Sequence, residues 1–475
     1  ETVDGGDAGD GNVGPDVPVL EPCGEPLPAA AEGVCEVAAG GDAVLLRGDL
    51  VLPTGLLERG QVLIIDDAIA CVGCDCASDP AAAGATWVTC ADAVISPGLV
   101  NAHDHITFAE MAPADHGTER FEHRHDWRKG QNGHKKIPAQ SNKHALGDAW
   151  GEMRHVVGGA TSLFGSGGED GFLRNLDRGN LLEGVVHGTA DYSTFPLGDS
   201  GGKTRTSGCV AWDIDDADQA EDQSAYVPHV AEGINVQARN EFLCTSSFEN
   251  GGEDLVFGTS AFIHGIGLRP SDVAVMAGDG AGLVWSPRSN TDLYGMTAEI
   301  PVYDRLGVLI ALGTDWSASG SMNMLRELAC AEQWSEEHWG GYLSEAQLVH
   351  MATDNAAELL GFGDVLGSLV PGRAADITIW DARDNSGYRA ILDAEPKDVT
   401  LVLRGGLPLY GDEALVEALV AGECETLDVC GTDKRLCAER EIGKTVSQLD
   451  GELGASVYDL FFCGVPDGEP SCHPA

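Results

Sequence analysis

Positively charged residues are scarce in this chain of 475 residues. Lys and Arg together number 28 against 76 Asp and Glu, which gives a formal net charge of −48 at pH 7. A surface this acidic repels polyphosphates and anionic lipids. We therefore expect no nucleic-acid binding and no attachment to an anionic membrane through a basic face. The charge favours solubility, in a salty or extracellular setting.

Long apolar runs are missing as well. The sequence holds no apolar span of about 18 residues, so nothing in it predicts a transmembrane segment. The opening stretch "ETVDGGDAGDGNVGPDVP" is rich in Gly and Asp and lacks the apolar periodicity of folded segments. We predict that residues 1–40 form a disordered or loosely ordered acidic tether left after removal of a signal peptide, and that the protein is extracytoplasmic. A lipid anchor upstream of residue 1 is an alternative to a free secreted form.

Cysteine is rare in the middle of the chain. Of 14 cysteines, only Cys209, Cys244 and Cys330 lie between residues 100 and 400. The other cysteines fall near the two ends, which favours disulfides that crosslink peripheral loops in an oxidising compartment. A zinc site at "CVGCDC" (residues 71–76) is the alternative, although no second Cys/His pair follows at the spacing of a zinc finger.

Strand-like segments occupy both flanks of a long middle region. Residues 43–72 read "AVLLRGDLVLPTGLLERGQVLIIDDAIACV", where short apolar runs alternate with Gly, Pro and charged turns. Residues 367–382 and 399–412 have the same character. We therefore predict a discontinuous β-sandwich built from residues 41–95 and 363–412, followed by a cysteine-containing extension over 413–475.

The middle region, residues 96–362, alternates strand-like and helical stretches, a pattern typical of an α/β protein with a parallel sheet. Seven strands are readable, and a closed (β/α)₈ TIM-like barrel needs eight; "CVAWDID" is the nearest candidate for the missing one. Helices are predicted over 322–332 and 344–360, the second with Ser344 as its N-cap. The strand candidates are "AVISPGLVNAH", "GATSLFGS", "ADYSTFPL", "AYVPHVAEG", "SAFIHGIGL", "GLVWSPRSN" and "VLIALGTDWS".

Histidines and one aspartate stand where these strands end. In a parallel barrel the carboxyl ends of the strands meet on one face, so residues far apart in sequence come together there. In "ISPGLVNAHDHITF", period-2 alternation puts His103 and His105 on the same side and Asp104 on the other. One histidine at a strand end is more often a core or loop residue, but the combination favours a Zn²⁺ or Fe²⁺ site. Its members are His103, His105, His229, His264 and Asp315.

The segments "PGLVNAHDH", "HVAEG", "FIHG", "WSPRSN", "GTDWSASGSMNMLREL", "ATDNAAELLG" and "GSLVPGRAADITIWD" occur in an order that resembles the amidohydrolase superfamily, closest to its deaminase and chlorohydrolase branch. The resemblance runs from about residue 43 to residue 410. It implies a (β/α)₈ barrel beside a β-sandwich made from both chain ends. It also implies that Glu232 is a proton shuttle and that His264 hydrogen-bonds the metal-bound water. The implied metal ligands are His103, His105, His229 and Asp315.

The resemblance leaves the number of metals open. Two-metal relatives carry a bridging lysine at the end of the fourth strand, and only Lys203 lies near the expected place. We expect one divalent metal, Zn²⁺ with Fe²⁺ as the alternative. The two-metal form stays open because the fourth strand is not located.

The implied chemistry is hydrolysis of a C–N bond in a small molecule, with deamination of an amino-heterocycle as the first expectation. A divalent metal lowers the pKa of bound water to about 7. Asp315 would take a proton from that water, His264 would orient it, and Glu232 would protonate the substrate. Attack on a C–halogen bond, hydrolysis of a cyclic amide, imidazolone or dipeptide, and a non-catalytic cell-surface protein with a relict barrel are the alternatives.

A basic stretch bears on the substrate. "RFEHRHDWRKGQNGHKK" (residues 120–136) follows the first strand, where barrel loops surround the active-site entrance. Arg124 and Arg128 are predicted to bind an anionic group of the substrate, with a solvated or ion-paired loop as the alternative. Ser289 and Asn290 are predicted to contact substrate or to cap the next helix. The sequence leaves a monomer and a homo-oligomer equally open.

Overall fold

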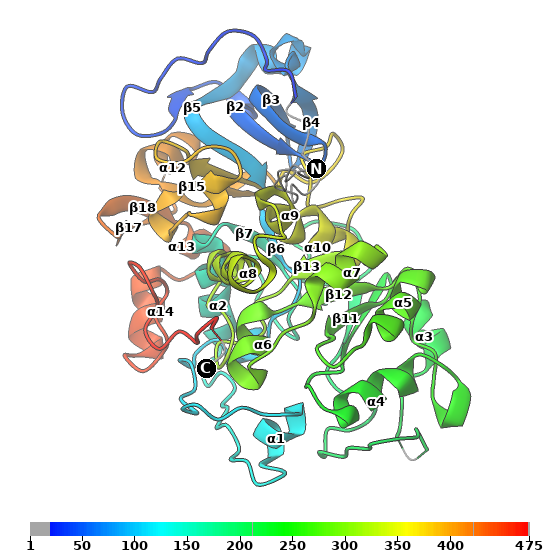
Figure 1. The fold of residues 1–475 in the computed structure, drawn as a ribbon. Coiled ribbons are helices and arrows are strands. Elements are labelled where there is room, and N and C mark those ends of the chain that lie inside the picture. The colour runs from blue at the N-terminus through cyan, green and yellow to red at the C-terminus, as the bar shows by residue number, and fades with distance from the viewer. Residues whose placement is uncertain (1–19, 211, 421, 474–475) are drawn as a thin grey trace, which may run out of the picture.

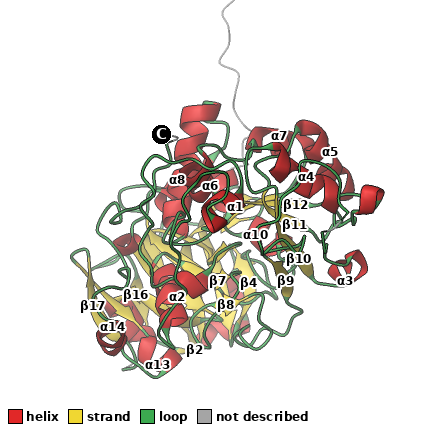
Figure 2. Ribbon diagram, turned by 90° about the horizontal axis from the view of Figure 1, so that it is seen from below, coloured by secondary structure: helices red, strands yellow, loops and turns green. Residues whose placement is uncertain are grey.

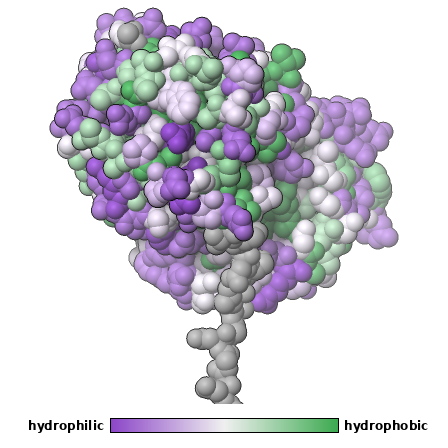
Figure 3. Space-filling model, turned by 90° about the horizontal axis from the view of Figure 1, so that it is seen from above, coloured by the Kyte–Doolittle hydropathy of each residue, from purple (hydrophilic) through white to green (hydrophobic). Residues whose placement is uncertain are grey.

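The computed structural model describes residues 20–210, 212–420 and 422–473 (Figure 1). Short parallel strands from the middle of the chain lie beside one large sheet that takes strands from both chain ends. The face in Figure 3 is covered mainly by hydrophilic residues, as the charge of the chain predicts. Within the described residues, no helix combines the length and the apolar character that crossing a bilayer requires.

Eight parallel strands surround the barrel axis. Three of them pair in the order β6-β7-β8 and five in the order β9-β10-β11-β12-β13. Backbone hydrogen bonds join the two groups: Ala190 N donates to Leu176 O at 3.1 Å, and Ala102 N donates to Leu312 O at 3.1 Å. The strands are β6 (Leu99–Asn101), β7 (Ala160–Leu163), β8 (Arg174–Asn175), β9 (Ala190–Ser193), β10 (Ala225–Val230), β11 (Ala261–His264), β12 (Gly282–Trp285) and β13 (Ile310–Leu312).

The strand that sequence reading missed is β8, and the expectation that it lies near "CVAWDID" is wrong. That segment holds only an isolated bridge between Val210 and Trp212. β8 consists of the two polar residues Arg174 and Asn175, so it has no apolar run to reveal it. Both side chains are buried, and Arg174 satisfies its charge with Asp376 through hydrogen bonds of 2.7 and 2.9 Å. With β8 in place, β9 is the fourth strand.

Helices lie on the outside of these strands, and α4, α5 and α7 gather on one side of them in Figure 2. The helix expected over 344–360 is two helices, separated at Thr353, whose backbone is non-helical. Ser344 is the N-cap of the first, because its hydroxyl accepts the Gln347 amide at 3.3 Å. The helices are α1 (Arg124–Lys129), α2 (Gly147–Val157), α3 (Ala217–Glu221), α4 (Val236–Thr245), α5 (Pro270–Asp279), α6 (Pro287–Tyr294), α7 (Ile300–Leu306), α8 (Met324–Trp339), α9 (Glu345–Met351) and α10 (Asp354–Leu359).

The large sheet joins both ends of the chain. Its strands follow the order β17-β18-β16-β15-β14-β5-β2-β3-β4, with β1 on β5. The two ends meet where β5 pairs with β14 in antiparallel register, Ile95 opposite Ile379. The strands are β1 (Glu36–Ala38), β2 (Gly41–Leu52), β3 (Gly55–Ile65), β4 (Ala68–Gly73), β5 (Ala85–Pro97), β14 (Ile377–Asp381), β15 (Val399–Arg404), β16 (Leu407–Asp412), β17 (Glu425–Val429) and β18 (Thr432–Leu436).

Both predicted tails contribute to this domain. Residues 1–19 of the expected tether lie outside the described residues, but the boundary drawn at residue 40 is too late, because β1 pairs with β5 and Cys23 is buried. The extension over 413–475 adds β17 and β18 to the sheet. It also carries α12 (Glu413–Leu419), α13 (Ala438–Ile442) and α14 (Val446–Leu453), while α11 (Arg389–Leu392) lies between β14 and β15.

All the cysteines are paired, which confirms the prediction of disulfides. The cysteines of "CVGCDC" belong to two of these bonds, so the alternative zinc site there is wrong. Crosslinks hold residues 20–40 where apolar burial is sparse, and disulfides of this density are typical of oxidising compartments. The pairs are Cys23–Cys74, Cys35–Cys90, Cys71–Cys76, Cys209–Cys244, Cys330–Cys472, Cys424–Cys437 and Cys430–Cys463.

Glu152 of α2 supports the segment around β8 from inside the core. Its carboxylate accepts the amides of Glu169 at 2.7 Å and Leu173 at 3.0 Å, and the Asn175 side chain at 3.0 Å. Burial of the side chain raises the pKa of Glu152 to about 8. The folded protein therefore retains a proton that the unfolded chain releases near pH 4.5.

Glu152→Gln tests this coupling. A raised folded-state pKa stabilises the protein fully below the unfolded pKa, and that stabilisation is lost as pH rises to about 8. The wild type should thus lose stability to unfolding between about pH 5 and pH 8, and E152Q should lose less over the same interval. Urea unfolding at several pH values measures both slopes. Equal slopes would show that Glu152 does not titrate in this range.

Candidate metal centre

Residues from four strand ends converge on one point of the barrel. His103 and His105 follow β6, His229 and His264 belong to β10 and β11, and Asp315 follows β13. The centroid of the His103 ring lies 5.0 Å from that of the His105 ring, 4.7 Å from that of His229 and 5.7 Å from that of His264. Asp315 Oδ1 lies 3.3 Å from His103 Nε2 and 3.5 Å from His105 Nε2. The structure therefore brings together all five residues that the sequence predicted.

Two of these residues have left-handed backbone conformations. His264 has a φ of +74° and Asp315 a φ of +62°. Such values cost a non-glycine residue about 1 kcal/mol or more, and they persist where surrounding contacts impose them. At Asp315 the contacts are backbone hydrogen bonds between the first and the last barrel strands. Its amide donates to His103 O at 3.0 Å, and its carbonyl accepts from His105 N at 2.9 Å.

The side chains present fit a divalent metal. Candidate ligand atoms of His103, His105 and His229 lie within 4.8 Å of one another, and so do those of His103, His264 and Asp315. Both ring nitrogens of His103 and Nε2 of His229 are buried without a hydrogen-bond partner among the described residues. Buried imidazole nitrogens without partners are unfavourable, and a cation would satisfy them. A set of nitrogen ligands with one carboxylate suits Zn²⁺ or Fe²⁺.

Electrostatics keep these histidines in the form that binds metals. Burial lowers the pKa of His103 and of His229 well below the usual value, and their imidazole neighbours lower it further. Burial also lowers the pKa of His105, to about 4. All three are therefore neutral near pH 7, with a lone pair available to an ion. The His229 ring is oriented by a 3.2 Å contact between its Nδ1 and Ser193 O.

Helix α6 contacts each of the residues predicted to be catalytic. Ser289 Oγ donates to Asp315 Oδ2 at 2.5 Å, and Asn290 Oδ1 lies 3.0 Å from His264 Nδ1. Tyr294 Oη donates to Glu232 Oε1 at 2.7 Å, and Glu232 Oε2 lies 3.7 Å from His264 Nε2.

Ser289 and Asn290 are fully buried, which changes their predicted role. The expectation that they contact substrate is not supported, because their side chains are occupied by Asp315 and His264. They do lie in the first turns of α6, but neither is its N-cap, which is Ser286. Their side chains hold those of Asp315 and His264 in place.

Tyr192 is a site residue that sequence reading missed. It is the third residue of the fourth strand, β9, and its hydroxyl lies 3.1 Å from His105 Nδ1. Its ring stacks on His103 with centroids 5.9 Å apart, and burial raises the pKa of its hydroxyl well above the usual value. Lys203, the one lysine considered as a bridging ligand, is exposed in the loop beyond. "ADYSTFPL" already contained the tyrosine, but its position in the barrel depended on finding β8.

Arg124 is buried and ion-paired within the protein, and it is also among the residues that line the pocket over the centre, so its binding of a substrate anion stays a prediction. Its guanidinium donates to Asp199 at 2.6 Å and lies 3.6 Å from Glu241. It also donates to Thr194 O at 3.0 Å, next to the end of β9. Arg124 thus donates from both terminal nitrogens to acceptors within the protein and contacts Thr194 and His229, at or next to the ends of β9 and β10.

Arg128 is different, because no carboxylate lies within ion-pair distance of it among the described residues. Its guanidinium carbon lies 4.2 Å from the centroid of the Phe195 ring, and Nη1 lies 2.9 Å from His125 Nδ1. The predicted role of Arg128 in binding an anion therefore stays open.

A pocket of about 450 Å³ opens over the centre. Its floor contains the predicted metal-site residues and Glu232, and its walls are aromatic. Cationic side chains stand at its edge. The lining includes His105, His229, His264, Asp315 and Glu232, the aromatic residues Phe108, Trp127, Phe195 and Trp316, and the cations Arg128, Lys129 and Lys136.

Comparison with known proteins agrees with this geometry. Residues 223–409 match the profile of the amidohydrolase family. A 5-methylthioadenosine/S-adenosylhomocysteine deaminase of Teredinibacter turnerae is 34% identical over 125 residues, 26% of this chain and 28% of the relative. A deaminase of the same name from Halobacterium salinarum is 23% identical over 404 residues, 72% of this chain and 84% of the relative.

The solved structures show the same fold. An adenosine deaminase from Xanthomonas campestris with bound zinc superposes with a TM-score of 0.52 at 19% identity, covering 77% of this chain and 92% of the other. This likeness shows the fold, and the match to the amidohydrolase family covers residues 223–409, less than half of the chain. The chain covers only 28%, 40% and 37% of the length of three of the curated relatives that it matches.

Metal analysis tests the centre directly. We expect the purified protein to carry a divalent metal, and His229→Ala to lose most of it, because His229 presents an unpartnered buried nitrogen. His338→Ala is the control, since His338 is exposed on α8. Elemental analysis by mass spectrometry after dialysis measures both. A wild type that neither carries a metal nor takes up added Zn²⁺ or Fe²⁺ would contradict the assignment.

Proposed function

We propose that this protein is a metal-dependent aminohydrolase that removes an amino group from a nitrogen heterocycle by hydrolysis. The observation that carries the proposal is that Glu232 and Asp315 both lie close to His264, in a pocket that aromatic side chains also line. The deaminases and the zinc-containing adenosine deaminase to which the chain is similar support the same reaction class. One Zn²⁺ per chain is the proposed cofactor.

The residues of this chain divide the work of proton transfer. A zinc ion held by His103, His105, His229 and Asp315 would supply Lewis acidity and lower the pKa of a water molecule. Ser289 restrains Asp315 through Oδ2 while Oδ1 faces His103 and His105, which places the carboxylate where it can accept a proton from the attacking water. The hydrogen bond from Tyr294 fixes Glu232 at the pocket floor, where it can pass a proton to a ring nitrogen or to the departing amine.

The environment of His264 determines its part in the reaction. Asn290 directs Nδ2 to Thr297 at 3.1 Å, which leaves Oδ1 to accept from His264 Nδ1. With its proton on Nδ1 alone, the ring would present the lone pair of Nε2 to the pocket. In this form His264 orients the attacking water by accepting a hydrogen bond, and it donates to a developing oxyanion only when it is doubly protonated.

The pocket suits a flat substrate with an anionic extension. Trp127, Trp316 and Phe108 offer aromatic faces of the kind against which heterocycles stack. Arg128, Lys129 and Lys136 line the same pocket without an acidic partner within ion-pair distance among the described residues, although the protein as a whole is strongly acidic. We infer that they attract a carboxylate or phosphate carried by the substrate. The disulfides support activity in an extracytoplasmic, oxidising compartment.

A substrate panel tests the proposed reaction. Ammonia release should be seen with aminopurines and aminopyrimidines, free or as nucleosides, and not with cyclic amides, imidazolones or dipeptides. Each heterocycle is offered with and without a carboxylate or phosphate. Arg128→Gln should raise KM for the anionic form only, because the neutral form makes no ion pair. Cleavage of an amide, without ammonia release from any aminated ring, would contradict deamination.

Asp315→Asn should abolish turnover while the fold is retained. Asparagine keeps the size of the side chain but cannot accept the proton of the attacking water, so we expect kcat to fall at least about 10²-fold. Asp364→Asn, at an exposed carboxylate, is the control. Steady-state ammonia release and circular dichroism measure the two effects. A rate for D315N within a few-fold of wild type would remove Asp315 from the mechanism.

A further inference from the structure

Helix α6 is short, although its side chains position three residues of the proposed catalytic site. It has 8 residues, a length at which an isolated helix is unstable in water. Three of its side chains, Ser289, Asn290 and Tyr294, hold Asp315, His264 and Glu232. The orientation of the catalytic groups therefore depends on what fixes α6 in its place.

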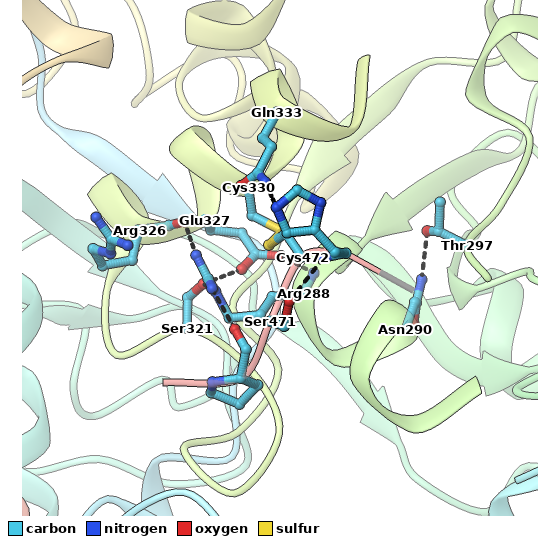
Figure 4. Close-up of a disulfide and its surroundings, with 12 residues drawn as sticks. Arg288, Asn290, Thr297, Ser321, Arg326, Glu327, Cys330, Gln333, Ser471 and Cys472 are labelled. Carbon is cyan, nitrogen blue, oxygen red and sulfur yellow. Dashed lines mark hydrogen bonds between the residues drawn. A yellow bond between two sulfur atoms is a disulfide. The ribbon is translucent and has the colours of Figure 1, made fainter. Parts of the chain in front are cut away.

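Arg288, the second residue of α6, provides that anchor. Its side chain is 4% exposed and makes the contacts drawn in Figure 4. Nε donates to Ser321 Oγ at 2.6 Å, Nη1 to Pro470 O at 2.6 Å, and Nη2 to Arg326 O at 2.8 Å. A planar guanidinium can satisfy three acceptors in this fork geometry, which lysine cannot reproduce.

The C-terminal segment supplies the charge that Arg288 needs. Glu469 Oε2 lies 3.2 Å from Arg288 Nη1, and Glu469 Oε1 accepts from Arg326 Nε at 2.7 Å. The Glu469 side chain is 5% exposed, so this is a buried pair, and removing its charge would leave Glu327 as the one buried carboxylate described beside Arg288. The disulfide between Cys472 and Cys330 attaches the same segment to α8 (Figure 4).

The anchor also reaches the loop that carries Asp315. Ser321, which accepts from Arg288, lies six residues after Asp315, and its amide donates to Thr314 O at 3.3 Å. Ser319 of the same loop contacts Ser289 through hydroxyl groups 2.9 Å apart. A shift of Arg288 would therefore change both sides of the hydrogen bond between Ser289 and Asp315.

We propose that residues 469–472 form a positioning element of the catalytic site, with Glu469 and the Cys330–Cys472 disulfide holding Arg288 and thereby α6. Arg288 and Glu469 are positioning residues, because neither lines the pocket. The inference that catalysis depends on them rests on the proposed function. The anchoring itself does not.

Glu469→Gln tests the element with little change in shape. We expect kcat to fall about tenfold with KM nearly unchanged, since small displacements of reacting groups reduce turnover rather than binding. Hydrogen exchange of the α6 amides should become faster, while the metal content stays at the wild-type level. Glu452→Gln is the matched control, because Glu452 pairs with Lys444 in the same C-terminal extension but lies in an exposed ion pair.

A second pair of variants removes the covalent attachment. Cys330→Ser with Cys472→Ser should have the same effects as E469Q, whereas Cys424→Ser with Cys437→Ser, at a disulfide next to the large sheet, should not. Unchanged α6 exchange in E469Q, or an equal loss of kcat in both controls, would overturn the proposal. Should wild-type protein release no ammonia from any substrate, the proposed function fails, and the exchange measurement still decides whether the C-terminal segment anchors α6.

Discussion

The pairing of the first barrel strand with the last is the contact on which the site depends. The amide of Asp315 donates to the carbonyl of His103, and the amide of His105 donates to the carbonyl of Asp315. These two bonds bring residues more than 200 positions apart into one plane of the barrel. They also impose the left-handed conformation of Asp315 and direct its carboxylate at both histidines.

The site is arranged at a cost to stability. Burial of neutral imidazoles leaves ring nitrogens without partners, which is unfavourable until a metal satisfies them. Hydrogen bonds from surrounding residues support this arrangement. Tyr192 and Ser193 contact the histidines, and side chains of α6 contact Asp315, His264 and Glu232. Such contacts fix the orientation of ligands and proton carriers without touching the substrate.

A site residue can be predicted from the sequence when the strand that carries it has a recognisable local pattern. The residues of the metal centre were readable because histidines and an aspartate stood at the ends of apolar strands, and parallel strands place those ends together. β8 was not readable, because Arg174 and Asn175 form a buried strand without an apolar run. Tyr192 was missed with it, since its place in the barrel required that strand.

The other differences between expectation and structure involve residues whose partners lie far away in the sequence. Arg124 pairs with Asp199 and Glu241, which follow far along the chain, so the sequence around Arg124 does not reveal these ion pairs. The sequence favours substrate contact or capping for Ser289 and Asn290, whereas the fold directs their side chains toward Asp315 and His264. Residues 20–40 looked like a tether because composition does not reveal which cysteines pair.

Anomalous diffraction at the metal absorption edge tests the central claim, that strand ends converge on one hydrolytic metal ion. A crystal of the purified protein should give a single strong peak within coordination distance of His103, His105, His229 and Asp315. Two peaks at this centre, or a peak bound elsewhere with these four side chains empty, would contradict the account.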